Sequence, residues 1–271
     1  MQMVKRLSVL ILTAALLQAC GGDRAERPQP VMIEPADMAD IGRTAFEQIK
    51  AKSTISANFE SQSRLRCVVG LLVAELPEET GDWDWQTVVF DDPAVDAFAL
   101  PGAAVGINSG MLDLIDDETE LAAVLSHELA HLQLRQPAAR VSAAFTVYNA
   151  IAAVQTYRGA QGPQQSRTLY ALLGLGSRVG LPLAYTSADE SAAFRAGLEL
   201  SARAGYDPAL SLRWWQKLVA AHGDSRPAWL SLHTDPSSRL AELQVLMPQL
   251  RALFETARAS GKAPDCRSAS G

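Results

Sequence analysis

The feature that most constrains this chain is a pair of histidines four residues apart, in the stretch "LSHELAH" (125–131). His127 and His131 lie within a predicted helix that begins near Glu118, because apolar residues recur there at helical spacing and no proline or glycine interrupts the run before Pro137. Residues at i and i+4 project from the same face of a helix. The two imidazoles can therefore converge on one ion.

Glu128 gives this pair a chemical meaning. Zinc binds neutral imidazole nitrogen, and a catalytic zinc keeps three protein ligands and one open position for water. Glu128 can reach that water and take its proton without being a ligand, as in the H-E-x-x-H metallopeptidases. The chain has only 4 histidines, so a chance match is rare. The pattern predicts that His127 and His131 bind Zn²⁺ and that Glu128 is the general base; the competing interpretation is two exposed histidines beside a glutamate.

A third protein ligand must come from further along the chain. The residues after "HELAH" do not have the glycine and histidine of the metzincin spacing, so a glutamate on a later helix, the gluzincin solution, is expected. Glu190 lies one turn into a helix predicted over 187–204, after a cap at Thr186 or Ser187. Spacing alone also allows Glu190 to be only a favourable charge in a first turn. The alternative ligands are Asp189 and Glu199.

The order of predicted elements indicates an α+β fold without β-α-β alternation. Glycine, proline and hydrophobic spacing predict helices over 37–58 and 64–76, strands over 83–90, 94–100 and 103–108, the helix from 118, and later helices over 138–157, parts of 165–180, 187–204, 208–221 and 236–258. In "RAGYDP", Gly205 suits a left-handed helix cap and Pro208 cannot continue the same helix. The expected domain is mainly helical with one small sheet.

Residues 1–19 have the pattern of a lipoprotein signal peptide. A basic start precedes an apolar run of about eleven residues, which is too short to span a bilayer. The segment "LQAC" then ends at Cys20, the predicted lipidation site, as in a bacterial lipobox; a plain secretory signal is the alternative. Residues 20–36 are rich in proline and charge and form a predicted tether. The glycines after Cys20 favour the outer membrane, by resemblance to Gram-negative lipoproteins.

The remaining chain divides into a body, 37–260, and a C-terminal tail, 261–271. Cys67 and Cys266 are an even pair in an oxidising compartment, which makes them disulfide candidates; two unpaired thiols are the alternative. The formal charge of −6 provides no basic face, so no nucleic-acid partner is expected.

Residues 83–245 resemble the M48 family of zinc metallopeptidases, the Ste24/HtpX-like group that includes periplasmic lipoproteins of Gram-negative bacteria. The segment "AVDAFALPGAAVGINSGMLDLIDDETELAAVLSHELAHL" is similar to the family's strand, Pro-Gly turn, edge strand and catalytic helix. "ADESAAFRAGLELSARAGYDP" resembles the third-ligand helix, and its first glutamate falls on Glu190. "HTDPSSRL" resembles the later His-to-Arg segment, which implies that His233 and Arg239 lie near the metal and stabilise the transition state.

The chain departs from the family pattern at three positions. Phe194 stands where an aspartate usually follows the glutamate ligand, and loss of such a ligand partner can cost 10–100-fold in metal affinity or activity. Asp96 replaces a frequent asparagine, and Gln136 replaces a histidine common after the catalytic helix.

The resemblance also makes 103–108 the edge strand that pairs with substrate, or else an ordinary structural strand. Residues 159–182 are expected to form a lid over the metal or a core-packing helix.

The resemblance implies a gluzincin fold and a zinc-dependent endopeptidase of the bacterial cell envelope. Its expected partners are unfolded or misassembled envelope polypeptides, and a lipid anchor would attach it to the membrane. The alternative is a non-proteolytic or weakly proteolytic chaperone or assembly lipoprotein that retains a zinc site.

Overall fold

The computed structural model describes residues 31–77, 83–144, 164–179, 181, 183–222, 229 and 237–266. The predicted signal peptide and Cys20 lie outside these residues. None of the helices in the described ranges combines the length and the apolar composition needed to cross a bilayer.

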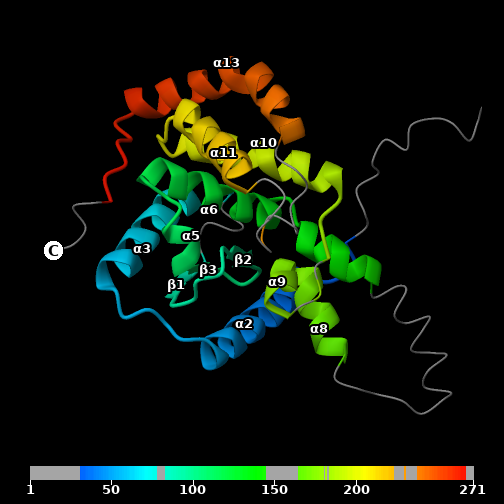
Figure 1. Ribbon diagram of the computed structural model, residues 1–271. Helices are drawn as coiled ribbons and strands as arrows, with labels where there is room; N and C mark the ends of the chain where they lie inside the picture. Colours follow the sequence, from blue (N-terminus) through cyan, green and yellow to red (C-terminus); the bar gives the residue numbers. More distant parts are fainter. Residues whose placement is uncertain are drawn as a thin grey trace, which may run out of the picture.

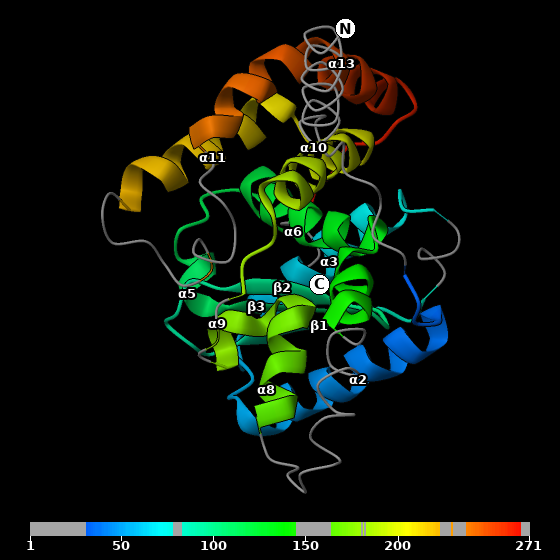
Figure 2. The same cartoon turned by 90° about the vertical axis from the view of Figure 1, so that its right-hand side faces the viewer.

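A small sheet lies between two layers of helices (Figures 1 and 2). The elements are α2 (Pro35–Lys52), α3 (Phe59–Val73), β1 (Gln86–Phe90), β2 (Ala97–Leu100), β3 (Ala104–Asn108), α5 (Ser109–Leu112), α6 (Glu118–Gln133), α8 (Gln164–Tyr170), the π-helical turn η1 (Ala171–Leu175), α9 (Gly176–Val179), α10 (Ser187–Arg203), α11 (Pro208–His222) and α13 (Ser237–Ala259). Residues 136–144 are also helical. The predicted mainly helical α+β fold is confirmed.

The sheet has the order β1-β3-β2, so β3 is its central strand. β1 runs parallel to β3, and β2 runs antiparallel to it. The expectation that 103–108 forms an edge strand is therefore wrong. The tight turn at Pro101-Gly102 folds β2 onto one side of β3, and β1 then pairs with the other side, where the Gln86 amide donates to the Ala103 carbonyl over 2.8 Å.

Side chains alternate between the two faces of the sheet, as the strand period requires. Val105 and Ile107 face a core shared with α3, α6, α10 and α11. Phe98 and Ala104 face a second core, built with α2 and η1. In Figure 2 the first group of helices lies above the sheet and the second group lies below it. The sheet is thus buried on both faces, which explains why all residues of β2 and β3 are buried.

Helix α6 is enclosed along most of its length, with every residue from Glu120 to Leu132 buried. It is packed by α3, α10, α11 and β2 at once, so its histidines and glutamates are buried together with its apolar residues. The carboxylate of Asp117 caps its start by accepting from the amides of Thr119 and Glu120 over 2.8 and 2.9 Å.

The chain breaks its helices after α6 and after α10, near Pro137 and at Gly205. After α6, the chain resumes a helix at 136, with Pro137 in its first turn, where proline is tolerated. After α10, Gly205 adopts φ 90°, and the Tyr206 amide donates back to Ser201 over 3.1 Å. This left-handed cap would be strained for any residue with a side chain.

The C-terminal segment is fastened to the body at Cys266. A disulfide joins Cys67 on α3 to Cys266, across 199 residues of sequence. The Cys266 amide also donates to the Glu118 carboxylate at the start of α6 over 2.9 Å. The last described residues of the chain are therefore held against the helix that carries the histidine pair.

Candidate metal centre

Three buried side chains from two helices meet at one point: His127 and His131 from α6, and Glu190 from α10. The two imidazole Nε2 atoms are 3.2 Å apart. The Glu190 carboxylate oxygens lie 3.5 Å from His127 Nε2 and 3.8 Å from His131 Nε2. All three side chains are at most 3% exposed.

These separations suit a zinc ion. Ligands about 2.0–2.2 Å from a tetrahedral zinc lie roughly 3.3–3.6 Å from one another. The observed 3.2, 3.5 and 3.8 Å bracket that range, and the donor set of two imidazoles and one carboxylate is one that zinc accepts in catalytic sites. The residues therefore fit the ion that the motif predicts.

The close approach of α10 to α6 depends on Gly197. A Cβ at this position would lie 2.9 Å from the Ser126 carbonyl oxygen and 3.0 Å from His127 Cα, both backbone atoms. The absence of a side chain lets the two helices touch at the metal ligand itself. At its start, α10 is fixed by a capping box between Thr186 and Asp189, which sets the rotation that turns Glu190 inward.

The alternative ligands of the third position are occupied elsewhere. The Asp189 carboxylate accepts from the Thr186 hydroxyl over 2.7 Å. The Glu199 carboxylate pairs with Arg203 and accepts from Gln249 over 3.1 Å. Glu190 is the one carboxylate of the described residues that joins the histidine pair.

Glu128 directly follows His127 on α6 but is not one of the three clustered side chains. Its carboxylate accepts a hydrogen bond from the Trp229 indole N–H over 2.9 Å, and the residue is 7% exposed. Trp229 was not foreseen from the sequence, because it is 101 residues away from Glu128 and no local pattern connects them.

Aromatic rings surround His127. Phe194, Trp215 and Trp229 all present edges or faces to its ring, with centroid separations of 6.4, 5.4 and 6.3 Å. Phe194 is buried and packs on Trp215 at 5.0 Å. At the position where the family usually has an aspartate, this chain therefore has an apolar contact to the metal ligand.

His131 is enclosed by a different set of groups. The ring of Tyr185 stacks on it, with centroids 4.0 Å apart and planes 16° from parallel. The Arg140 guanidinium lies 4.2 Å from the Tyr185 centroid and donates to the carbonyls of Ala171 and Leu183. Burial raises the pKa of Tyr185 well above its ordinary value, although Arg140 opposes the shift, so its hydroxyl stays neutral.

Asp96 forms an ion pair away from the histidines. Its carboxylate lies 3.0 Å from Arg178 Nε, and Arg178 also donates to Asn108 and lies over the rings of Phe90 and Phe98. Burial lowers the pKa of Arg178, while Asp96 and Asp92 raise it. Residues 169–175, from the segment expected to form a lid or a core-packing helix, pack into the core below the sheet.

Two predicted site residues are not placed at the centre by the structure. His233 lies outside the described residues. Arg239 is in the first turn of α13, and its side chain lies outside the description. Their roles near the metal remain predictions.

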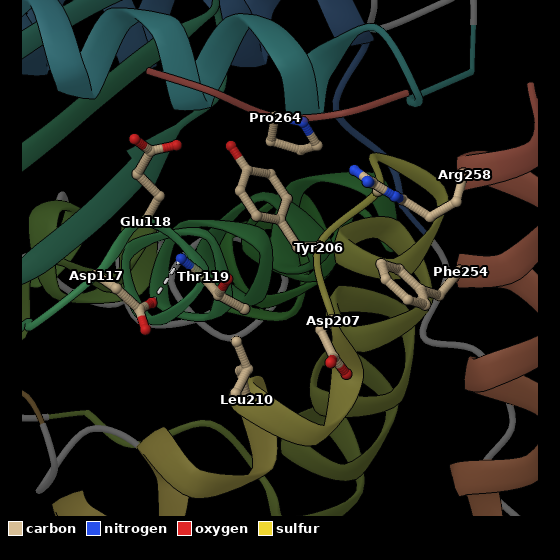
Figure 3. A pocket seen from close by; sticks show the side chains of 10 residues that line it. Asp117, Glu118, Thr119, Tyr206, Asp207, Leu210, Phe254, Arg258 and Pro264 are labelled. Atoms are coloured by element: carbon tan, nitrogen blue, oxygen red, sulfur yellow. Dashed lines mark hydrogen bonds between the residues drawn. The ribbon is translucent and has the colours of Figure 1, made fainter. Parts of the chain in front are cut away.

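A pocket of about 220 Å³ lies at the other end of α6 and contains none of the metal-centre residues. Figure 3 shows its lining, which comes from the starts of α6 and α11, the end of α13 and the C-terminal segment. Tyr206 is buried there at 3% exposure, and its hydroxyl has no hydrogen-bond partner among the described residues.

The helical fold and the His-His-Glu centre define a metallopeptidase domain of the H-E-x-x-H type. The chain belongs to peptidase family M48, whose model matches residues 60–246. This confirms the resemblance recognised in the sequence, and it extends the region of likeness from 83 back to 60.

Three relatives illustrate the similarity. The chain is 32% identical to the mitochondrial metalloendopeptidase OMA1 of Schizosaccharomyces pombe, over 65% of this chain and 50% of the relative. It is 32% identical to the mitochondrial metalloendopeptidase OMA1 of Bos taurus, over 64% and 34%, and 27% identical to the beta-barrel assembly-enhancing protease of Escherichia coli, over 61% and 35%. The match spans between a third and a half of these longer proteins.

Proposed function

We propose that this protein is a zinc-dependent endopeptidase. The observation that carries the proposal is the convergence of His127, His131 and Glu190 on one buried point, with Glu128 next to His127 in the sequence of α6. The named relatives are metalloendopeptidases, which supports the same activity here.

In the proposed reaction, His127, His131 and Glu190 hold the zinc ion. The bound ion would supply Lewis acidity, which polarises the peptide carbonyl and makes a water molecule more acidic. Glu128 takes the proton of the attacking water and passes it to the nitrogen of the leaving amine. Trp229 orients the Glu128 carboxylate through its indole N–H. The surrounding aromatic rings lower the local dielectric, which strengthens these interactions.

The site of action is proposed to be the bacterial cell envelope. The lipobox ending at Cys20 supports a lipid-anchored, periplasmic-side location, and the Cys67–Cys266 disulfide suits an oxidising compartment. One relative is named for β-barrel assembly in Escherichia coli, whereas others are mitochondrial. We infer that the substrates are unfolded or misassembled envelope polypeptides and that the anchor lies in the outer membrane.

The test is a pair of variants assayed for zinc content and casein cleavage. Glu128→Gln should abolish cleavage and leave one zinc bound, because the base is lost and no ligand is. His131→Ala should lose both. Glu199→Gln is the matched control, since this glutamate lies on α10 but bonds to Gln249 and Arg203 instead. Full casein cleavage by Glu128→Gln would refute the role of Glu128.

A non-proteolytic assembly factor that retains zinc is the competing function. One observation favours it: Phe194 stands at the position of the usual aspartate, with its ring against His127. If the Glu128→Gln protein restores outer-membrane assembly in cells that lack the parent protein, this second function is the correct one.

A further inference from the structure

Gln136 connects the two helices that carry the metal ligands. It is the first residue of the helical segment 136–144 and is buried at 7% exposure. Its side-chain oxygen lies 2.5 Å from His131 Nδ1, and its side-chain nitrogen donates to the backbone carbonyl of Asp189 over 2.8 Å. Asp189 directly precedes Glu190, so one amide reaches both sides of the metal centre.

The chemistry of these partners fixes the direction of the amide. A backbone carbonyl can only accept, so the Gln136 NH₂ must face Asp189, and the Gln136 carbonyl oxygen must face His131. That oxygen can only accept as well, so His131 Nδ1 must carry a hydrogen. In neutral His131, Nε2 then has the lone pair, and Nε2 is the atom that lies near Glu190 and His127.

Stacking on Tyr185 cannot provide this orientation. The stack fixes the plane of the His131 ring, but a half-turn about the bond to the ring keeps that plane and exchanges Nδ1 with a carbon. Only a group at the ring edge distinguishes the two arrangements. Among the described contacts of the Nδ1 edge, Gln136 provides the hydrogen bond.

We propose that Gln136 is a positioning residue: it orients His131 as a metal ligand and ties that ligand to the first turn of α10, beside Glu190. This inference rests on the proposed zinc site. Partners that orient histidine ligands typically contribute 10–100-fold to metal affinity.

Two near-isosteric variants separate the two bonds. Gln136→Glu keeps an acceptor for His131 Nδ1–H but loses the donor to Asp189 and places a carboxylate against its carbonyl. Gln136→Met loses both bonds without adding that repulsion. Gln249→Met, on the exposed face of α13, is the control for a glutamine-to-methionine change.

The measurement is zinc affinity by chelator competition, together with the melting temperature of the metal-free proteins. We expect Gln136→Met to bind zinc 10–100-fold more weakly than the parent chain and Gln136→Glu to stay within about threefold. Gln136→Glu should nevertheless melt no higher than Gln136→Met. A role limited to stability predicts instead that affinity falls in step with melting temperature, and that result would overturn the proposal, as would unchanged affinity in Gln136→Met.

The tautomer gives a second readout that does not depend on metal loading. Nitrogen-15 NMR of the metal-free parent should show a proton on His131 Nδ1, and the opposite tautomer would overturn the inference. If the parent chain binds no zinc at all, the proposed function fails with it. If the parent binds zinc tightly and Gln136→Met binds it equally well, only the role of Gln136 fails.

Discussion

Replacing Gly197 with alanine tests how closely the metal centre depends on the contact between α6 and α10. The added Cβ would lie 2.9 Å from the Ser126 carbonyl oxygen, and ordinary contact begins near 3.4 Å, so α10 must move by about 0.5 Å. The atoms nearest to this Cβ belong to the backbone of Ser126 and His127, so no flexible side chain can move aside. Glu190 lies seven residues earlier on the same helix, about two turns away, and would move with it.

This displacement is large for a metal site but modest for stability. Ligand distances in such sites tolerate about 0.2 Å, so we expect zinc affinity to fall at least tenfold. Overpacking costs about 1–3 kcal/mol. The better helix propensity of alanine offsets about 1 kcal/mol of that, so the metal-free protein should lose only about 0–2 kcal/mol. Zinc competition and urea unfolding of the metal-free protein measure the two effects.

Gly70→Ala on α3 is the matched control, because a Cβ at Gly70 meets no atom within 4 Å. It should gain up to about 1 kcal/mol, which corresponds to about 2–4 °C in melting temperature, with zinc affinity unchanged. If Gly197→Ala binds zinc within twofold of the parent and is stabilised like Gly70→Ala, the proposed close packing at His127 is refuted.

Three further outcomes are expected. Removal of zinc by a chelator should lower the melting temperature, since free zinc at 1,000 times Kd contributes about 4 kcal/mol, and His131→Ala should show no zinc-dependent shift in a thermal scan. Replacing Cys67 and Cys266 together by serine should cost about 2–5 kcal/mol in urea unfolding, as expected for a long closed loop. Burial, with a contribution from Glu118, raises the pKa of Tyr206 in the folded protein. The folding stability that depends on neutral Tyr206 is complete below about pH 10. It is lost as the pH rises further, because the tyrosine of the unfolded chain ionises first. Tyr206→Phe should therefore be nearly neutral at pH 8 and should reduce the loss of stability between pH 8 and 11; an equal loss in both proteins would contradict this.

The helix of the metal centre was predictable because its signals are local. The spacing of His127 and His131, the start near Glu118 and the end near Pro137 all lie within about twenty residues, and a helix converts such spacing directly into geometry. The same holds for the cap at Gly205.

Contacts between distant segments carried no comparable signal. The order of strands depends on which strand pairs with the second side of β3, and the local hairpin at Pro101-Gly102 does not determine that. Trp229 reaches Glu128 only because the chain returns to α6 after 101 residues. Gln136 was visible as a departure from the family, but its bridge to Asp189 depends on where α10 packs.

The bond between Cys67 and Cys266 also determines what happens to a molecule whose backbone has been cut. Both ligand-bearing helices lie between these cysteines, so one cleavage in that interval leaves the two pieces linked through sulfur. A nicked molecule would migrate near its full mass on a denaturing gel without reductant, and would separate into two bands only after thiol treatment. The two helices that carry the metal ligands would therefore stay covalently joined after a single break in the chain between them.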